Sequence, residues 1–304
     1  MPSRLHETFA YVVPRLRRAR ELVDEPRERA RVTAWHRTLD RGLPTAAVAR
    51  FAHRFSVVTE ELGDAGARFP AYVVTRRGRE PTRTLIYVHG GGYMAPMDPF
   101  HVRYATRLAT ALDARLVLPA YPLAPEHSWR DSFGPMAAMV ARWSAAPGGA
   151  VLAGDSAGGG YALALAVALR DRGGAQPTDL VLHSPWVDLT LSAPGTAERN
   201  AVDPWLFLGK ATAYAAWWAG TPDDLARPEV SPSLADLGGL PRALMTYGTR
   251  DLLAPGCDLL ARRAVEAGWD LTTVVEDDVI HVFAIMPALA EARRAFRRTV
   301  EWLG

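Results

Sequence analysis

Short apolar runs rich in β-branched residues alternate with longer helix-like segments along most of the chain, from residue 55 onward. Strands that are apolar throughout and separated by helices favour a mostly parallel sheet, because the crossover helices cover both of its faces. The pattern predicts eight strands, at residues 55–62, 69–78, 84–90, 115–121, 150–155, 179–186, 242–248 and 271–277, of which the first two form a pair joined by a turn. The helix-like segments lie at 104–112, 136–143, 157–170, 259–267 and 287–302. We therefore expect an α/β fold with helices on both faces of the sheet.

Two parts of the chain depart from this regular alternation. Residues 1–54 have apolar residues at three- to four-residue spacing, with breaks at Pro26 and Pro44, and predict an N-terminal helical cap segment. From about 188 to 230, an aromatic-rich segment separates two strands and predicts a cap insertion in a core that spans 55–304. Its aromatic residues are Trp205, Phe207, Tyr214, Trp217 and Trp218. They either line an enclosed apolar pocket or form ordinary core packing.

Composition and charge narrow the classes of protein. Of the 304 residues, 49% are hydrophobic and 22% are charged, as in ordinary globular proteins. The formal net charge is only +2, which argues against nucleic acid as a partner. Cys257 is the single cysteine, and we expect it to be an inert buried thiol. The first residues lack the apolar core of a signal peptide, and no apolar run reaches the about 18 residues of a membrane span, so we expect a cytoplasmic protein.

The strongest chemical signal lies where the apolar run 150–155 ends. Ser156 is the serine of the sequence GDSAG, and a helix-like run follows at once. A G-x-S-x-G sequence between a strand and a helix holds a nucleophilic serine on a sharp, strained turn, where Gly154 and Gly158 avoid collisions. A phosphate-binding loop is also rich in glycine, but no lysine follows these glycines and the dinucleotide spacing is missing. We therefore predict that Ser156 is a nucleophile.

A serine hydroxyl needs a base to take its proton, and the base needs a third group to fix its tautomer. In this kind of sheet the acid and then the histidine follow the serine along the chain. His183 and His281 are the histidines after Ser156. His183 lies within a predicted strand and fits a packed core residue, so His281, on a loop before the last helix, is the predicted base. Asp251 is the predicted acid, although it could instead cap a helix, and the alternatives are Asp188, Asp258, Asp277 and Asp278.

A run of three glycines follows His89 at the end of the apolar run 84–90. When a serine attacks an acyl carbonyl, the carbonyl oxygen becomes an oxyanion, and fixed hydrogen-bond donors lower the barrier. A sequence of the HGGG type supplies backbone N–H donors from the loop that faces the nucleophile. A flexible surface loop is a poor alternative, because these glycines directly follow a buried strand.

Together, these motifs resemble those of the hormone-sensitive lipase family of α/β-hydrolases, the bacterial group IV esterases. The matching stretches are HGGGY at 89–93, YPLAPEH at 121–127, GDSAGG at 154–159, GTRDLL at 248–253 and HVF at 281–283. They occur in the family's order over residues 55–304, and the N-terminal helices are similar to the family's cap. The resemblance implies the α/β-hydrolase fold.

The resemblance also implies the roles of individual residues. The catalytic triad would be Ser156, Asp251 and His281. The oxyanion hole would be formed by the backbone amides of Gly91, Gly92 and Ala157. Residues 121–127 would support the site from beneath, with Glu126 in a hydrogen-bonded network, and His89 would shape the glycine loop.

Three features depart from the family's pattern. The family often carries D-P-L-x-D after its seventh core strand, but Asp251 is followed here by LLAP, so the second acid is missing. The usual glycine after the histidine is replaced by Val282, and APM at 95–97 replaces a common Gly-Ser pair. The last two changes touch the rim of the pocket. The candidate substrate-binding residues are Tyr93, Val282, Phe283 and Trp205.

The expected function is that of a serine carboxylesterase that hydrolyses short- to medium-chain or small hydrophobic esters through an acyl-enzyme intermediate, with no metal or organic cofactor. A lactonase or an amide deacetylase would use the same triad. A non-catalytic small-molecule receptor on this fold is the alternative from another class; the gibberellin receptors resemble this family but lack the catalytic histidine, which is present here as His281. The expected partner is a small ester, and a homodimer is left open.

Overall fold

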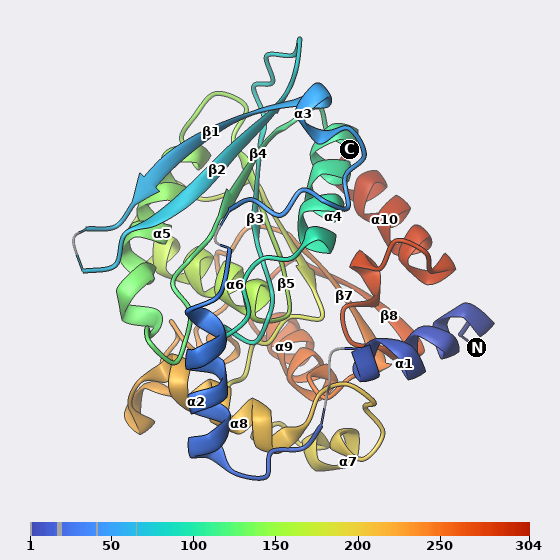
Figure 1. Ribbon diagram of the computed structural model, residues 1–304. Coiled ribbons are helices and arrows are strands. Elements are labelled where there is room, and N and C mark those ends of the chain that lie inside the picture. The colour runs from blue at the N-terminus through green and yellow to red at the C-terminus, as the bar shows by residue number, and fades with distance from the viewer. Residues whose placement is uncertain (1, 17–19, 41, 65) are drawn as a thin grey trace.

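The computed structural model describes residues 2–16, 20–40, 42–64 and 66–304, which form a central sheet with helices on both sides (Figure 1). Within these ranges, the strands are β1 (Phe55–Leu62), β2 (Phe69–Arg76), β3 (Thr84–Val88), β4 (Arg115–Pro119), β5 (Ala150–Asp155), β6 (Asp179–His183), β7 (Ala243–Arg250) and β8 (Leu271–Ile280). They lie in the order β1-β2-β4-β3-β5-β6-β7-β8. The β1–β2 and β2–β4 pairs are antiparallel and the others are parallel. The predicted α/β fold with an eight-stranded, mostly parallel sheet is confirmed.

Helices pack against both faces of this sheet. The described helices are α1 (Arg4–Leu16), α2 (Glu25–His36), α3 (Phe51–Arg54), α4 (Pro99–Ala111), α5 (Trp129–Ser144), α6 (Ser156–Asp171), α7 (Thr196–Asn200), α8 (Leu208–Ala219), α9 (Ala254–Glu266) and α10 (Ala290–Leu303). In β5, Ala150 and Leu152 belong to the apolar cluster that contains α5, α6 and α9, whereas Val151 and Ala153 belong to the cluster that contains α4 and α10. This alternation follows from the two-residue period of a strand. Both faces of β5 are therefore buried, as its continuous apolar sequence requires.

Helices α4, α5 and α9 begin earlier than the sequence pattern predicts, and at α4 a polar side chain caps the first turn. Asp98 accepts hydrogen bonds from the Phe100 and His101 amides, so α4 begins at Pro99. A proline in the first turn is tolerated, since the amide it lacks would have no partner within the helix. The predicted break lies just before Pro26: residues 20–24 are not helical, and Pro26 lies in the first turn of α2.

The N-terminal helix α2 and the helix α8 of the insertion lie close together at one end of the molecule (Figure 1). The Tyr214 hydroxyl of α8 donates a hydrogen bond to Glu28 Oε1 of α2 at 2.6 Å, and Lys210 Nζ lies 3.6 Å from the same oxygen. Arg31 binds Glu28 through two further hydrogen bonds and, against the effect of burial, holds the pKa of Glu28 at about 2. Glu28 is therefore charged at neutral pH and joins the two helices. The division of the chain into a cap and a core stays a prediction.

None of the helices that the structure describes is both long and apolar enough to cross a membrane.

Candidate active site

The sharp turn between β5 and α6 holds Ser156. Its backbone lies in the left-handed region, with φ of 52°, which is strained for any residue other than glycine. The turn packs so tightly that a Cβ on Gly154 would lie 2.4 Å from the Gly158 carbonyl oxygen, and one on Gly158 would lie 2.1 Å from the Val88 carbonyl oxygen. Both glycines of the sequence motif are thus required by close backbone approach, as predicted.

His281 directly follows β8, and its ring bridges two residues that are far away in the sequence. Its Nε2 lies 2.9 Å from Ser156 Oγ, and its Nδ1 lies 2.8 Å from Asp251 Oδ2. A carboxylate can only accept, so Nδ1 carries the proton and Nε2 has the lone pair that can accept the serine proton. The geometry is that of a serine nucleophile with its base and a third group that orients the base.

Asp251 follows β7 and is fully buried. Its Oδ1 accepts a hydrogen bond from the Leu253 amide at 2.9 Å, so that one oxygen is held by the turn before α9 and the other is left for His281. The helix-capping role that the sequence left open for Asp251 is not seen, because Leu253 is the N-cap residue of α9 and no side-chain hydrogen bond caps it.

The competing residues have other partners. His183 is buried on β6 and its Nε2 lies 2.6 Å from the Tyr104 hydroxyl; burial lowers its pKa to about 4, so it is neutral. Asp258 accepts a hydrogen bond from the Tyr247 hydroxyl, and Asp277 accepts one from Thr249. Cys257 is buried, and burial raises the pKa of its thiol well above the usual value, which makes it a poor nucleophile.

The electrostatic environment of His281 favours its charged form. Burial by itself lowers the pKa of His281, but the charge of Asp251 and its hydrogen bond to Nδ1 raise it by more, with smaller contributions from Asp203 and Asp155. The net pKa lies above the ordinary value. A base of this kind is well suited to hold the proton that it takes from serine.

The glycine loop lies against the serine turn. Gly91 and Gly92 have φ of 117° and 59°, conformations that side chains rarely adopt. The Gly90 amide donates a hydrogen bond to Asp155 Oδ1 at 3.2 Å, and a Cβ on Gly90 would lie 3.0 Å from the Cβ of Ser156. The bare backbone of this loop therefore comes close to the serine. Because α6 begins at Ser156, the Ala157 amide belongs to its first turn, whose amides have no partner within a helix.

Residues beneath the loop fix its shape. The His89 Nδ1 lies 2.7 Å from the Gly90 carbonyl oxygen, and its ring stacks on Tyr121, whose hydroxyl donates to the His89 carbonyl oxygen. Glu126 Oε2 lies 2.7 Å from His36 Nδ1, while the other nitrogen of that ring lies 2.7 Å from the Met94 carbonyl oxygen. Glu126 is thus part of a hydrogen-bonded network that links α2 to the glycine loop. These hydrogen bonds do not involve the Ser156 hydroxyl.

Comparisons with known proteins identify the family of the chain. A family model described as an alpha/beta hydrolase fold matches residues 85–285. This chain belongs to the alpha/beta-hydrolase family. The hydrolase is 33% identical over 225 residues to a protein named acetyl-hydrolase from Streptomyces hygroscopicus, in a match that covers 72% of this chain and 75% of the relative. It is also 30% identical to carboxylesterase NlhH of Mycobacterium tuberculosis, over 70% of this chain and 72% of that protein.

Among solved structures, an esterase from the bacterial hormone-sensitive lipase family is similar to this hydrolase over its whole length. The TM-score is 0.77 and the sequence identity is 28%, and the match covers 100% of this chain and 98% of the other. The resemblance to the hormone-sensitive lipase family is confirmed.

The four candidate substrate-binding residues of the hydrolase lie in different surroundings. Tyr93 is 1% exposed and stacks on Trp218 at 4.3 Å between ring centroids, within an aromatic cluster, and Phe283 is fully buried. Val282 follows the histidine and adopts φ of 47°, where the family's usual glycine would be unstrained. Trp205 presents its ring edge-on to that of His281, with centroids 5.8 Å apart. Substrate contact by these residues stays a prediction.

The sequence analysis missed Asp203, and it named Tyr214 only as one of the aromatic residues of the insertion. Asp203 accepts hydrogen bonds from the Trp205 and Leu252 amides, each at 2.7 Å. Burial, and then the charge of Asp251, raise the pKa of Asp203 to about 6. Tyr214 lies against the glycine loop, where a Cβ on Gly92 would be 3.3 Å from its ring. Neither residue belongs to a recognisable motif, because each acts through contacts with distant segments.

Within the described ranges, no three His, Cys, Asp or Glu side chains gather in a way that could hold a metal ion.

Proposed function

We propose that this hydrolase is a serine carboxylesterase that cleaves short- to medium-chain or small hydrophobic esters through an acyl-enzyme. The observation that carries the proposal is the continuous chain of hydrogen bonds from Asp251 through His281 to Ser156. The serine lies on a strained turn at the start of a helix, beside a loop of bare backbone amides. The relatives named acetyl-hydrolase and carboxylesterase NlhH support the same reaction class.

The first half of the reaction acylates Ser156. His281 Nε2 takes the proton of the hydroxyl, and Oγ forms a bond to the ester carbonyl carbon, whose oxygen becomes an oxyanion. We assign the oxyanion donors to the amides of Gly91, Gly92 and Ala157. The tetrahedral intermediate collapses as His281 gives the proton to the leaving alcohol. Asp251 stays ionised throughout and stabilises the imidazolium form of His281.

The second half releases the acid. Water replaces the alcohol, and His281 Nε2 takes a proton from it as its oxygen attacks the acyl carbon. The same amides hold the second oxyanion. The bond to Ser156 Oγ breaks, His281 returns the proton to Oγ, and the carboxylic acid leaves. All proton transfers pass through one ring nitrogen, which faces the serine at 2.9 Å.

The surroundings of the serine favour small acyl groups. Ser156 is 8% exposed, Trp205 lies beside His281, and Tyr214 lies against the glycine loop. We infer that these rings limit the length of the acyl chain. The relative named acetyl-hydrolase makes the acetyl group the first acyl group to test, in esters and also in amides, since a deacetylase would use the same triad.

The direct test measures kcat/KM for p-nitrophenyl esters from acetate to octanoate, together with lactones and acetanilides. We expect turnover of the short esters and a loss of about 10⁴-fold or more in Ser156→Ala. Ser192→Ala, at an exposed serine of the insertion, should retain full activity. Failure of every ester would contradict the proposal, and preferential turnover of lactones or anilides would assign the chain to one of the related reactions.

Covalent labelling separates an enzyme from a receptor. A fluorophosphonate should modify the wild-type hydrolase at Ser156 with one-to-one stoichiometry, because the reaction needs both an activated hydroxyl and an oxyanion hole. An inert Ser156 in a folded chain would favour a non-catalytic ligand sensor. The assembly state, the exclusion of nucleic acid and the cytoplasmic location stay predictions.

A further inference from the structure

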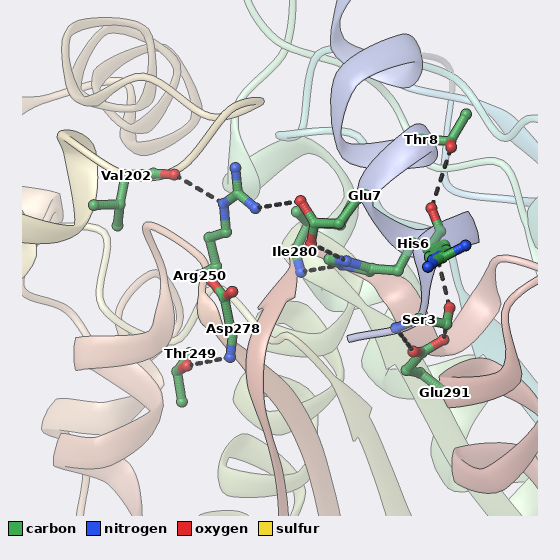
Figure 2. A network of polar contacts seen from close by, with 11 residues as sticks. Ser3, His6, Glu7, Thr8, Val202, Thr249, Arg250, Asp278, Ile280 and Glu291 are labelled. Carbon is green, nitrogen blue, oxygen red and sulfur yellow. Dashed lines mark hydrogen bonds and ion pairs between the residues drawn. The ribbon is translucent and has the colours of Figure 1, made fainter. Parts of the chain in front are cut away.

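Side chains from elsewhere in the fold hold the backbone on both sides of His281. The Ile280 amide donates a hydrogen bond to His6 Nε2 of α1 at 3.0 Å, and the Val282 amide donates one to Ser184 Oγ at 3.1 Å. Ile280 and His6 are both fully buried. Figure 2 shows the His6 ring facing Ile280 at the end of β8. The turn that carries His281 is therefore fixed by two anchors, one of which belongs to the N-terminal helix.

The sheet itself does not supply a regular ladder at this point. The register of the β7–β8 pair shifts between Gly248 and Arg250, and Arg250 is the residue paired with Ile280. A buried amide without an acceptor is costly, so the Ile280 amide must find a partner elsewhere. The His6 ring provides that partner across 274 positions in the sequence.

The hydrogen bond defines the proton state of His6. Because the Ile280 amide is the donor, Nε2 must carry a lone pair, and the proton of the neutral ring is on Nδ1. Nδ1 lies 3.2 Å from Glu7 Oε1, which can accept that proton. A neutral ring with both nitrogens partnered can be buried without an uncompensated charge.

Helix α1 is itself fixed at two further points. The Ser3 amide and hydroxyl donate hydrogen bonds to Glu291 of α10, at 2.6 and 3.1 Å. At the other side, Glu7 Oε2 lies 3.3 Å from Arg250 Nη1, and Arg250 immediately precedes the triad acid (Figure 2). The segment that leads into His281 thus contacts His6, and the segment that leads into Asp251 contacts the next residue of α1, Glu7.

We propose that His6 is a positioning residue for His281. As the acceptor for the Ile280 amide, it holds the strained turn in the conformation that points His281 Nε2 at Ser156 Oγ. This inference rests on the proposed esterase function. A displacement of about 1 Å at a catalytic group can cost as much as about 100-fold in rate, so an anchor one residue from the base should affect kcat. A residue that merely packs α1 would alter stability or substrate binding instead.

Two substitutions of His6 distinguish its role as a hydrogen-bond acceptor from the packing of its ring. His6→Gln places its terminal amide where Nε2 lies and can still accept from Ile280, whereas His6→Asn has polar atoms only where Nδ1 lies. His53→Asn, at an exposed histidine of α3, is the matched control. The readouts are kcat and KM for p-nitrophenyl butyrate, and hydrogen–deuterium exchange of a peptide that covers residues 279–284.

In His6→Asn we expect kcat to fall about tenfold or more and KM to change less than about threefold, with exchange of the peptide about tenfold faster. His6→Gln and His53→Asn should stay near the wild type. An unchanged kcat in folded His6→Asn, or an equal loss in His6→Gln, would overturn the proposal. Should the wild type itself turn over no ester, the esterase function fails, and exchange still decides the anchor: faster exchange in His6→Asn alone supports it, and unchanged exchange overturns it.

Discussion

Asp203 of the insertion accepts a hydrogen bond from the Leu252 amide, one residue after the acid that orients His281, at 2.7 Å. Its other oxygen accepts from the Trp205 and Leu206 amides, at 2.7 and 3.0 Å. One carboxylate therefore ties the loop that carries Trp205 to the turn that carries Asp251. Asp203 lies close to the buried carboxylate of Asp251, and its negative charge contributes to the raised pKa of His281.

The substitution Asp203→Asn should lower activity and also shift its pH dependence. We expect kcat/KM to fall about tenfold, because the amide group of Asn can accept for one loop but presents a donor to the other. The charge of Asp203 contributes to the raised pKa of His281, so its removal should move the acidic limb of the pH profile to lower pH. Asp188→Asn is the control, since Asp188 is a buried carboxylate that holds the Thr190 and Ala193 amides. A lower kcat/KM with an unshifted pH profile would contradict the expected effect of the Asp203 charge on the pKa of His281.

The wild-type hydrolase should gain activity as the pH rises through a midpoint above 6.5. His281 must be neutral to accept the serine proton, and its pKa is raised because Asp251 outweighs the effect of burial. The profile of kcat/KM between pH 5 and 9 measures the pKa in the free enzyme. Fluorophosphonate labelling should follow the same limb, since it needs the same base. A midpoint below 6.5 for both reactions would be at odds with this environment of His281.

Gly158→Ala should destabilise the fold at the serine turn. The new Cβ would lie 2.1 Å from the Val88 carbonyl oxygen and 2.4 Å from that of His89, so the backbone must move. We expect a loss of about 3 kcal/mol in the free energy of unfolding and no measurable esterase activity. Gly256→Ala in α9 is the control: its Cβ would have only ordinary contacts, the nearest at 3.6 Å, and should be neutral or stabilise by up to about 1 kcal/mol. Chemical denaturation of both variants makes the comparison.

Tyr214 should limit the length of the acyl chain. Its ring lies against Gly92, and its hydroxyl is held by Glu28. Removal of the ring in Tyr214→Ala opens space above the glycine loop, and we expect the ratio of kcat/KM for octanoate to that for acetate to rise about tenfold or more.

Tyr214→Phe is the matched variant for this prediction. It keeps the ring and loses only the hydrogen bond from Tyr214 to Glu28, one of the polar contacts between α8 and α2, so the chain-length ratio should stay unchanged while the stability falls by about 1 kcal/mol. A ratio that changes equally in both variants would mean that the link between the helices, and not the ring, controls the length.

The sequence by itself determined the features that depend on contiguous residues. Eight runs of apolar and β-branched residues define the strands, because strand formation follows from local periodicity. Burial on both faces does not hold for the edge strands β1 and β8, many of whose residues are exposed. The GDSAG sequence defines the strained turn at Ser156, since strand, glycines and helix follow each other without interruption. Helix starts were less well predicted: α4 begins where Asp98 accepts hydrogen bonds from two amides, and hydrophobic periodicity does not contain such a contact.

Only the tertiary structure decided which distant side chains meet. Five aspartates after Ser156 were considered for the acid, and Asp251 is the one that approaches His281 within 2.8 Å. Asp203 binds the Leu252 amide, in the turn of Asp251, from 49 positions away. His6 binds the Ile280 amide, next to His281, from 274 positions away. The distance between donor and acceptor in a hydrogen bond varies by only a few tenths of an ångström, and the packing of separate segments sets that distance. Local sequence patterns therefore identify the reacting groups, whereas the groups that hold them in place emerge only when the chain is folded.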